Sequence, residues 1–94
     1  MDLIDAVIHD DYMLAKQLLE DGANPNLFED GAEVTPLLFA VQRKKTAIIV
    51  LLLKHGADPF FQEKMLGESA YDFAVSTGLS EIAKLLSKNT VLIH

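Results

Sequence analysis

Cysteine and tryptophan are absent from the 94 residues of this chain. Without thiols the protein has neither a disulfide framework nor a thiolate zinc site, and it suits a reducing compartment, so we expect it in the cytoplasm. Long hydrophobic runs are missing too, because the longest, residues 47–53, is far shorter than the roughly 20 residues of a membrane-spanning helix. Asp2 and Asp5 stand where an export signal carries positive charge. We therefore expect neither a membrane segment nor export.

Positive charge is scarce in the first third of the chain. Residues 1–34 hold nine acidic residues and one base, Lys16, which gives a net charge of −8, whereas the rest of the chain carries +2. An acidic surface repels nucleic acid and anionic lipid and attracts basic partner surfaces. Two interpretations stay open: steering toward a partner with a basic patch, or a solvated face that keeps the protein soluble.

The residues that are present suit one folded domain. Half of them are hydrophobic and 23% are charged, which is too apolar for a disordered chain and allows a core of modest size. We expect residues 1–94 to form a single domain.

The most informative pattern is a repeat with a period of 34 residues. Such self-similarity is typical of proteins built from stacked structural units. The recurring groups are Ala6-Val7, Ala40-Val41 and Ala74-Val75; Leu18, Leu52 and Leu86; and residues 22–25 with 56–59, which read Gly-Ala-Asn-Pro and Gly-Ala-Asp-Pro. The sequence therefore predicts three similar units.

Each unit is predicted to contain two short helices followed by an irregular linker. In the middle unit Thr35 can cap a helix that begins at Pro36, since proline lacks only an N–H that would be unpaired there. That helix should end near Arg43. A second helix is predicted from about Thr46 to Lys54, and Gly56 follows where a left-handed residue commonly closes a helix.

The second helix of the middle unit, residues 47–53, is apolar nearly all round, which indicates that it is covered on both sides. Its counterparts keep polar positions: Val50 is replaced by Lys16 in the first unit and by Lys84 in the third. The outer units therefore look like caps on a complete stack. The predicted units span approximately residues 2–34, 35–68 and 69–88, followed by a C-terminal tail at 89–94.

Two repeat families have periods close to this one, and the linkers decide between them. A tetratricopeptide unit is nearly all helix, whereas about 13 residues rich in Gly, Asn, Asp and Pro separate Gly22 from Thr35. The segment Thr35-Pro-Leu-Leu-Phe-Ala40 closely resembles the ankyrin signature T-P-L-H-x-A, and the two Gly-Ala-Asn/Asp-Pro stretches resemble the ankyrin loop. Over roughly residues 2–88, the chain is similar to ankyrin-repeat proteins. The resemblance implies an all-α solenoid of three helix–turn–helix units joined by long hairpin-like loops.

The chain departs from the family pattern at two points. The histidine of the signature is Leu38 in the middle unit, Ile4 in the first and Asp72 in the third, so the hydrogen bonds that this histidine usually makes are not expected. Each linker is also one residue longer than the common spacing, which predicts a displaced or bulged loop tip.

The resemblance also implies a binding surface, because first-helix ends and loop tips form the concave partner-binding face in this family. The first-helix ends contribute Ile8, His9, Gln42, Arg43, Ser76 and Thr77. The linker tips contribute Phe28, Glu29, Asp30, Glu33, Val34, Phe61, Glu63, Lys64, Met65 and Glu68.

Two features of this surface allow more than one interpretation. The aromatic residues of the linkers are either exposed anchors for a partner or fold back over the helices. Phe60, near the base of its loop, suits either interpretation, whereas Phe28 and Phe61 favour exposure. The basic cluster at residues 43–45 either stabilises the negative end of a helix or contacts an acidic partner.

We find no arrangement of nucleophile, base and supporting group, and the glycines sit at turns rather than in a phosphate-binding loop. We therefore expect neither catalysis nor a cofactor. Asp5 and His9, one helical turn apart, are interpreted as a solvent-facing pair, with a two-residue metal site as the alternative. The apolar residues 91–93 are expected to pack across the third unit, and pairing with a second copy is the alternative.

These patterns predict a non-catalytic module that binds another protein, favouring one with a basic patch, and recruits or inhibits it. A dedicated inhibitor or immunity-type protein of a basic enzyme is the alternative within this class. A self-assembling structural unit and a metal-binding protein are the alternatives outside it. We expect a monomer that binds neither nucleic acid nor membranes.

Overall fold

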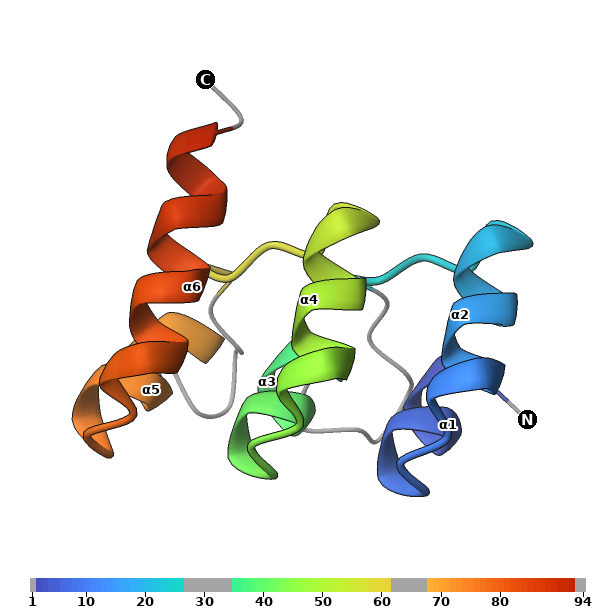
Figure 1. Ribbon diagram of the computed structural model, residues 1–94, viewed down its shortest axis with the longest axis horizontal. Helices are drawn as coiled ribbons and strands as arrows, with labels where there is room; N and C mark the ends of the chain where they lie inside the picture. Colours follow the sequence, from blue (N-terminus) through green and yellow to red (C-terminus); the bar gives the residue numbers. More distant parts are fainter. Residues whose placement is uncertain (1, 27–34, 62–67, 93–94) are drawn as a thin grey trace.

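The computed structural model describes the backbone of residues 2–26, 35–61 and 68–92, and the side chains as far as Ser87. In these ranges the regular structure is helical, which confirms the predicted all-α class. Three helix pairs stand side by side in chain order (Figure 1). The six helices are α1 (Leu3–Ile8), α2 (Tyr12–Glu20), α3 (Pro36–Gln42), α4 (Thr46–Lys54), α5 (Ala70–Ser76) and α6 (Ser80–Leu92).

The first helix of each pair begins at a side chain that caps it. The Thr35 hydroxyl accepts a hydrogen bond from the Leu38 N–H at 3.2 Å, and Pro36 is the first residue of α3. This confirms the predicted start of α3, whose cap accepts from an N–H that has no partner within the helix. Ser69 of α5 makes the same contact with the Asp72 N–H at 3.0 Å.

Left-handed residues close the turns between helices at equivalent positions of the repeat. Asp10, Lys44 and Gly78, each 34 residues apart, have φ values of 54°, 58° and 76° and join the two helices of each unit. Gly22 and Gly56, with φ values of 100° and 94°, follow α2 and α4. Glycine adopts this conformation without steric cost, which confirms the predicted helix end before Gly56.

Helix α6 has 13 residues, four more than α2 and α4 with nine each. The position equivalent to Gly22 and Gly56 is Thr90, a β-branched residue for which the left-handed conformation is costly. The backbone therefore continues as a helix to Leu92, where the sequence had predicted a separate tail from residue 89. The end of α6 projects beyond α2 and α4 (Figure 1). The predicted packing of residues 91–93 concerns side chains outside the described ones.

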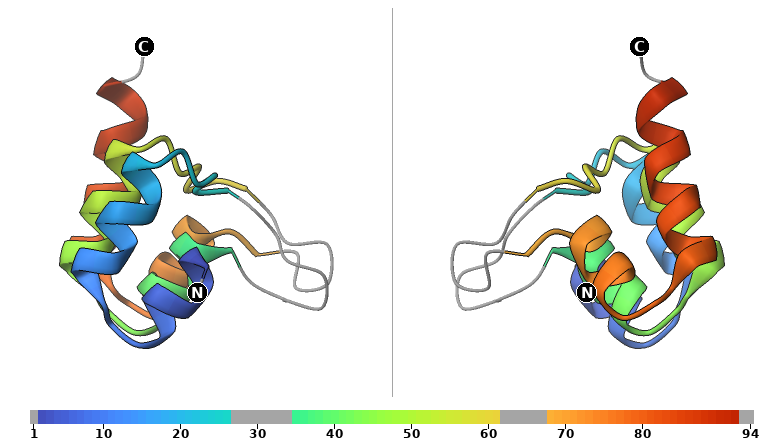
Figure 2. Two further views of the ribbon diagram at one scale, coloured as in Figure 1. Left: turned by 90° about the vertical axis from the view of Figure 1, so that its right-hand side faces the viewer. Right: turned by 90° about the vertical axis from the view of Figure 1, so that its left-hand side faces the viewer.

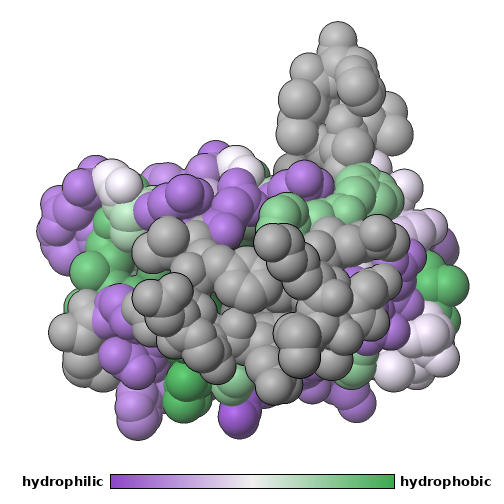
Figure 3. Space-filling model, turned by 180° about the vertical axis from the view of Figure 1, so that it is seen from behind, coloured by the Kyte–Doolittle hydropathy of each residue, from purple (hydrophilic) through white to green (hydrophobic). Residues whose placement is uncertain are grey.

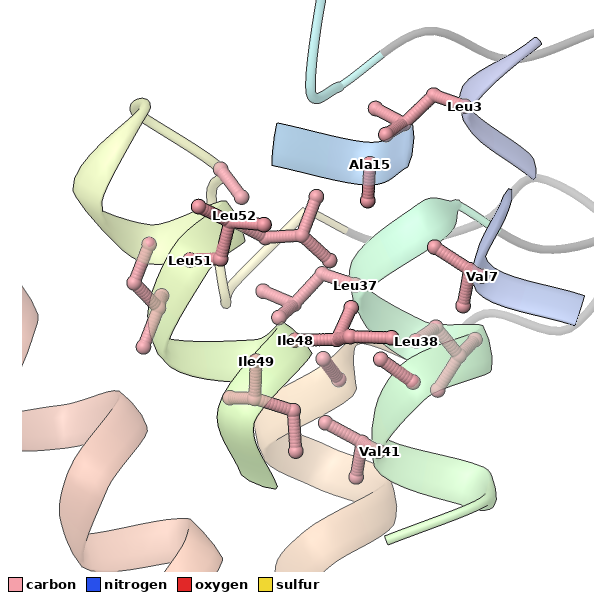
Figure 4. Close-up of a cluster of buried hydrophobic side chains, with 14 of the residues drawn as sticks. Leu3, Val7, Ala15, Leu37, Leu38, Val41, Ile48, Ile49, Leu51 and Leu52 are labelled. Carbon is pink, nitrogen blue, oxygen red and sulfur yellow. The ribbon is translucent and has the colours of Figure 1, made fainter. Parts of the chain in front are cut away.

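The helices form two layers. Helices α1, α3 and α5 lie together in one layer, and α2, α4 and α6 lie in the other (Figure 2). The core fills the space between the layers and between successive pairs, and α3 and α4 contribute most of its large residues (Figure 4). Ile49 and Leu52 of α4 are completely buried, whereas Lys16 of α2 and Lys84 of α6 are exposed. This confirms that α4 is covered on both sides.

The bases of the two linkers are joined by one side chain. The Asn26 amide donates to the carbonyl of Gly56 at 3.1 Å, and its oxygen accepts from the Asp58 N–H at 2.7 Å. This contact holds the first linker against the second unit near α4. The predicted bulged tips fall at residues 27–34 and 62–67, outside the described residues.

None of the helices in the described ranges combines the length and the apolar character needed to cross a membrane.

Candidate protein-binding face

The six predicted residues at the first-helix ends occupy equivalent places in the three pairs. In each pair they are the last helical residue and the C-cap that follows it. All six side chains are exposed although the helices that carry them are packed into the core. We call this set the inner-helix row: Ile8, His9, Gln42, Arg43, Ser76 and Thr77.

The described bases of the linkers lie on the side of the first helices. Helices α1, α3 and α5 form one layer, the described linker bases at residues 23–26 and 57–61 extend past it, and α2, α4 and α6 lie on the opposite side (Figure 2). Figure 3 shows the side of the first helices in space-filling form, with hydrophilic and hydrophobic surface next to each other. The row residues lie at the C-terminal ends of α1, α3 and α5, where each pair turns toward its second helix.

At the middle of the row, the Arg43 guanidinium lies over an aromatic ring. Its central carbon lies 4.4 Å from the centroid of the Phe39 ring, within the range of a cation–π contact. Phe39 is partly buried and was not among the predicted site residues. The signal that could have identified it is its position four residues before Arg43, which places both side chains on one helix face.

In the third unit the polar groups of the row are used within the helix. The Ser76 and Thr77 hydroxyls both donate to the Phe73 carbonyl, at 3.2 Å and 2.6 Å. This end of the row therefore offers hydroxyl groups that already have a partner. Arg43 is the long cationic side chain of the row.

Several acidic residues of the first unit have structural roles. Asp2 and Asp5 form a capping box, in which the Asp2 carboxylate accepts from the Asp5 N–H at 2.9 Å. Asp11 caps α2 by accepting from Leu14 N–H at 3.1 Å, and the Asp10 carboxylate pairs with the Lys45 ammonium at 3.2 Å. The predicted acidic contact surface then depends on Glu29, Asp30 and Glu33, which lie outside the described residues.

The capping box also bears on the alternative metal site at Asp5 and His9. The Asp5 carboxylate accepts from the Asp2 N–H at 3.5 Å, so this side chain is used at the start of α1. In residues 2–26, 35–61 and 68–87 no three His, Cys, Asp or Glu side chains come close enough to hold a metal ion. The pattern Asp-x-x-Asp before an apolar run was the available signal for a cap.

The aromatic residues at the base of the second linker are exposed. Phe60 and Phe61 expose 42% and 41% of their surface. The Phe60 ring also packs on Tyr71, with 5.0 Å between the centroids, so it is held in place without being hidden. Of the other predicted linker residues, Glu68 is partly buried. Those outside the described residues are Phe28, Glu29, Asp30, Glu33, Val34, Glu63, Lys64 and Met65.

Comparison with known proteins extends this picture. The chain is 50% identical over 62 residues to the human 2-5A-dependent ribonuclease, which covers 66% of the chain and 8% of that protein. It is 43% identical over 61 residues to a putative ankyrin repeat-containing protein of Treponema pallidum, covering 65% of the chain and 20% of the relative. It is 35% identical over 92 residues to the putative E3 ubiquitin-protein ligase XBAT34 of Arabidopsis thaliana, covering 96% and 24%.

The chain thus spans less than a quarter of the length of each of these relatives. A family model of three ankyrin repeats matches residues 3–93, which is nearly the whole chain. Together with the three helix pairs and the 34-residue period, this match settles the family. The chain belongs to the ankyrin-repeat family.

Proposed function

We propose that this chain is a non-catalytic module that binds one partner protein on the inner-helix row and the adjoining linkers, and thereby recruits or inhibits it. Ankyrin repeats generally mediate protein–protein interaction. The observation that carries the proposal is the exposure of all six row residues at equivalent positions of three packed helix pairs. A surface that recurs unburied in each unit is available to another molecule.

The rigidity of the stack supports this function. Row residues follow directly from helices whose other faces are buried, so their backbone positions are fixed before a partner arrives. Ordering a surface on binding costs free energy, and a surface that is already ordered avoids much of that cost. Arg43 and Phe61 belong to residue types, arginine and aromatic, that often contribute much of the energy of an interface.

A dedicated inhibitor of a basic enzyme is a second form of the same function. It is favoured by the charge of −8 in residues 1–34, since complementary charge accelerates the encounter of two proteins. In this form the acidic residues of the first linker contact a basic patch of the enzyme. Whether the partner is recruited or inhibited is decided by assaying the partner's activity with and without the chain.

The proposal is tested by capturing a partner on the immobilised chain, identifying it by mass spectrometry and measuring its affinity for two variants. We expect Arg43→Glu and Phe61→Ala each to weaken binding about tenfold or more, as loss of a central interface residue does. Thermal unfolding should be almost unchanged, because both side chains are exposed.

Two matched controls make the result specific to this face. Lys16→Glu changes the net charge by the same amount as Arg43→Glu but lies on α2, in the other layer. Met13→Ala truncates a side chain that is 69% exposed, also on α2. If the controls weaken binding as much as Arg43→Glu and Phe61→Ala do, the partner contacts another surface and the proposal fails.

A further inference from the structure

We infer that the partner presents the carboxylate of an Asp or Glu side chain to Arg43, next to an apolar residue. This inference rests on the proposed function and adds the chemistry of the group bound at the centre of the row. At this one position the partner is inferred to be negatively charged, whereas the acidic composition of the first unit predicts a partner with a basic patch.

The geometry of Arg43 favours a carboxylate. Its guanidinium group lies over the face of the Phe39 ring, with 4.4 Å from its central carbon to the ring centroid. A guanidinium group carries five N–H donors, more than one contact with a ring can use, and in the described ranges no carboxylate pairs with them. A carboxylate matches a guanidinium group with two parallel hydrogen bonds, an arrangement that lysine cannot reproduce.

The ring also reduces what binding costs. A free arginine side chain loses rotamer freedom when it forms an ion pair. Contact with Phe39, one helical turn earlier in α3, already restricts Arg43 before the partner arrives. The pair therefore acts as a prepared receptor for an anion.

The neighbouring charges leave this receptor available. Within residues 2–26, 35–61 and 68–87 there is one ion pair, between Lys45 and Asp10, and Arg43 takes no part in it. Lys45 is thus partly neutralised, while the described carboxylates of Asp5 and Asp11 bind backbone N–H groups at helix starts. The centre of the row presents the positive charge of Arg43, and the adjacent Lys44 is also exposed.

An exposed apolar side chain of the row stands on the neighbouring helix. Ile8, which is equivalent to Gln42 and precedes the equivalent of Arg43 by one residue, is 38% exposed, and its helix α1 packs directly against α3. A partner residue adjacent to the carboxylate can cover the Ile8 side chain and remove apolar surface from water. The preferred motif is accordingly an acidic residue with an aliphatic or aromatic neighbour.

The probe for this inference is a phage-displayed library of random peptides, selected on the immobilised chain. We expect the selected peptides to share an Asp or Glu beside an apolar residue. In a synthetic copy of the best peptide, replacing that Glu by Gln or Asp by Asn should weaken binding to the native chain about tenfold, because a charged hydrogen-bonded pair is lost.

The same peptide change should have almost no effect on binding to Arg43→Gln, since the two groups act as a pair in a double-mutant cycle. Lys16→Gln is the matched control; it removes the same charge from α2 and should behave as the native chain does. Phe39→Leu keeps an apolar side chain but removes the ring, and should weaken acidic-peptide binding by a smaller factor, about threefold.

The outcomes separate the inference from the function that it rests on. A library that yields no acid-dependent peptide, or a peptide whose acid does not couple to Arg43, overturns the inference. If the selected peptides do not depend on an acidic residue but bind more weakly to Ile8→Ala or Gln42→Ala than to the native chain, the row remains a binding face and the proposed function survives. If the selected peptides bind every row variant as tightly as the native chain, both fail.

Discussion

Two sets of equivalent positions in the first helices differ in what they hold and in how they are exposed. Positions 7, 41 and 75 are valine in all three units. Val7 and Val41 are completely buried, whereas Val75 is 54% exposed. Positions 9, 43 and 77 hold histidine, arginine and threonine, and all three side chains are exposed. The burial of the valine depends on its place in the stack, but the exposure of the other position does not.

The difference separates stability from recognition within one short helix. A valine is repeated where each unit packs against the next, because a close-packed core tolerates few shapes. The residue type changes freely two positions later, where no neighbouring unit in the described ranges constrains it. We therefore assign stability to the faces between units and recognition to the inner-helix row.

The third unit shows the same rule at the end of the stack. Its outer side has a shallow groove of about 400 Å³ lined by Tyr71, Ala83, Lys84 and Ser87. The middle unit has the larger, apolar Ile49 in place of Ala83, and Ile49 is completely buried. The first unit also has alanine here, Ala15, which is completely buried, so the partial exposure of Ala83 reflects its place at the end of the described stack and not its residue type.

The largest effect is expected from a charge placed between units. Val41→Asp buries a carboxylate without a partner and should cost more than about 4 kcal/mol of unfolding free energy. Domains of this kind have only about 5–15 kcal/mol in total, so much of the protein should unfold. Val75→Asp should cost less than about 1 kcal/mol, since its side chain already reaches water. Urea denaturation monitored by circular dichroism measures both losses of unfolding free energy. Equal losses for the two variants would contradict the difference between the buried and the exposed valine.

A second pair of variants tests the outer layer. Leu52 of α4 is completely buried, and its equivalent Leu18 of α2 is partly buried. Leu52→Ala should cost about 3 kcal/mol, because it removes buried methyl groups and leaves a cavity. Leu18→Ala should cost about 1 kcal/mol, because its site is open to solvent. The same denaturation experiment measures both losses of stability. A larger loss for Leu18→Ala would show that α2 does not lie at the end of the stack.

A smaller effect is expected where one side chain joins the two linkers. Asn26→Ala removes both hydrogen bonds to the second linker, at 3.1 Å and 2.7 Å, and should cost about 1 kcal/mol. Asn26→Asp keeps the acceptor for the Asp58 N–H but turns a carboxylate oxygen toward the Gly56 carbonyl, so its cost should be higher. Thermal unfolding distinguishes the two variants. If both match the native chain, the contact does not contribute to stability.

The smallest change in stability is expected in the row itself. Arg43→Glu removes the contact with Phe39 and should cost no more than about 1 kcal/mol. A loss of stability as large as that of Leu52→Ala, measured by the same method, would mean that Arg43 has a structural role. The distinction between the valine positions and the exposed row positions would then not hold.

Much of the fold could be predicted from the sequence because the same helix-start and helix-end signals recur in more than one unit. Thr35-Pro36 and Gly56 predicted the start of α3 and the end of α4 correctly, since capping and left-handed turns depend on a few adjacent residues. The extension of α6 was missed although its signal was present: Thr90 replaces the glycine that follows the other two helices of this layer.

The site was predicted less fully. The location of the row residues at the ends of the first helices follows from the period of 34 residues, and their role in binding stays a prediction. The acidic residues of the first unit were interpreted through their net charge alone, and the capping roles of Asp5 and Asp11 were overlooked. The exposure of Phe60 could not be decided, because it depends on the approach of Tyr71 from another unit, which no local pattern records.

The most direct test of the central claim is a map of the partner's contact on the chain, obtained from amide chemical-shift changes by NMR when the captured partner is added. We predict the largest changes at the inner-helix row, from Ile8 through Arg43 to Thr77, with α2 and α4 nearly unaffected. Changes that concentrate on the outer layer, or on the groove at Tyr71 and Ala83, would contradict the assignment of recognition to the inner helices.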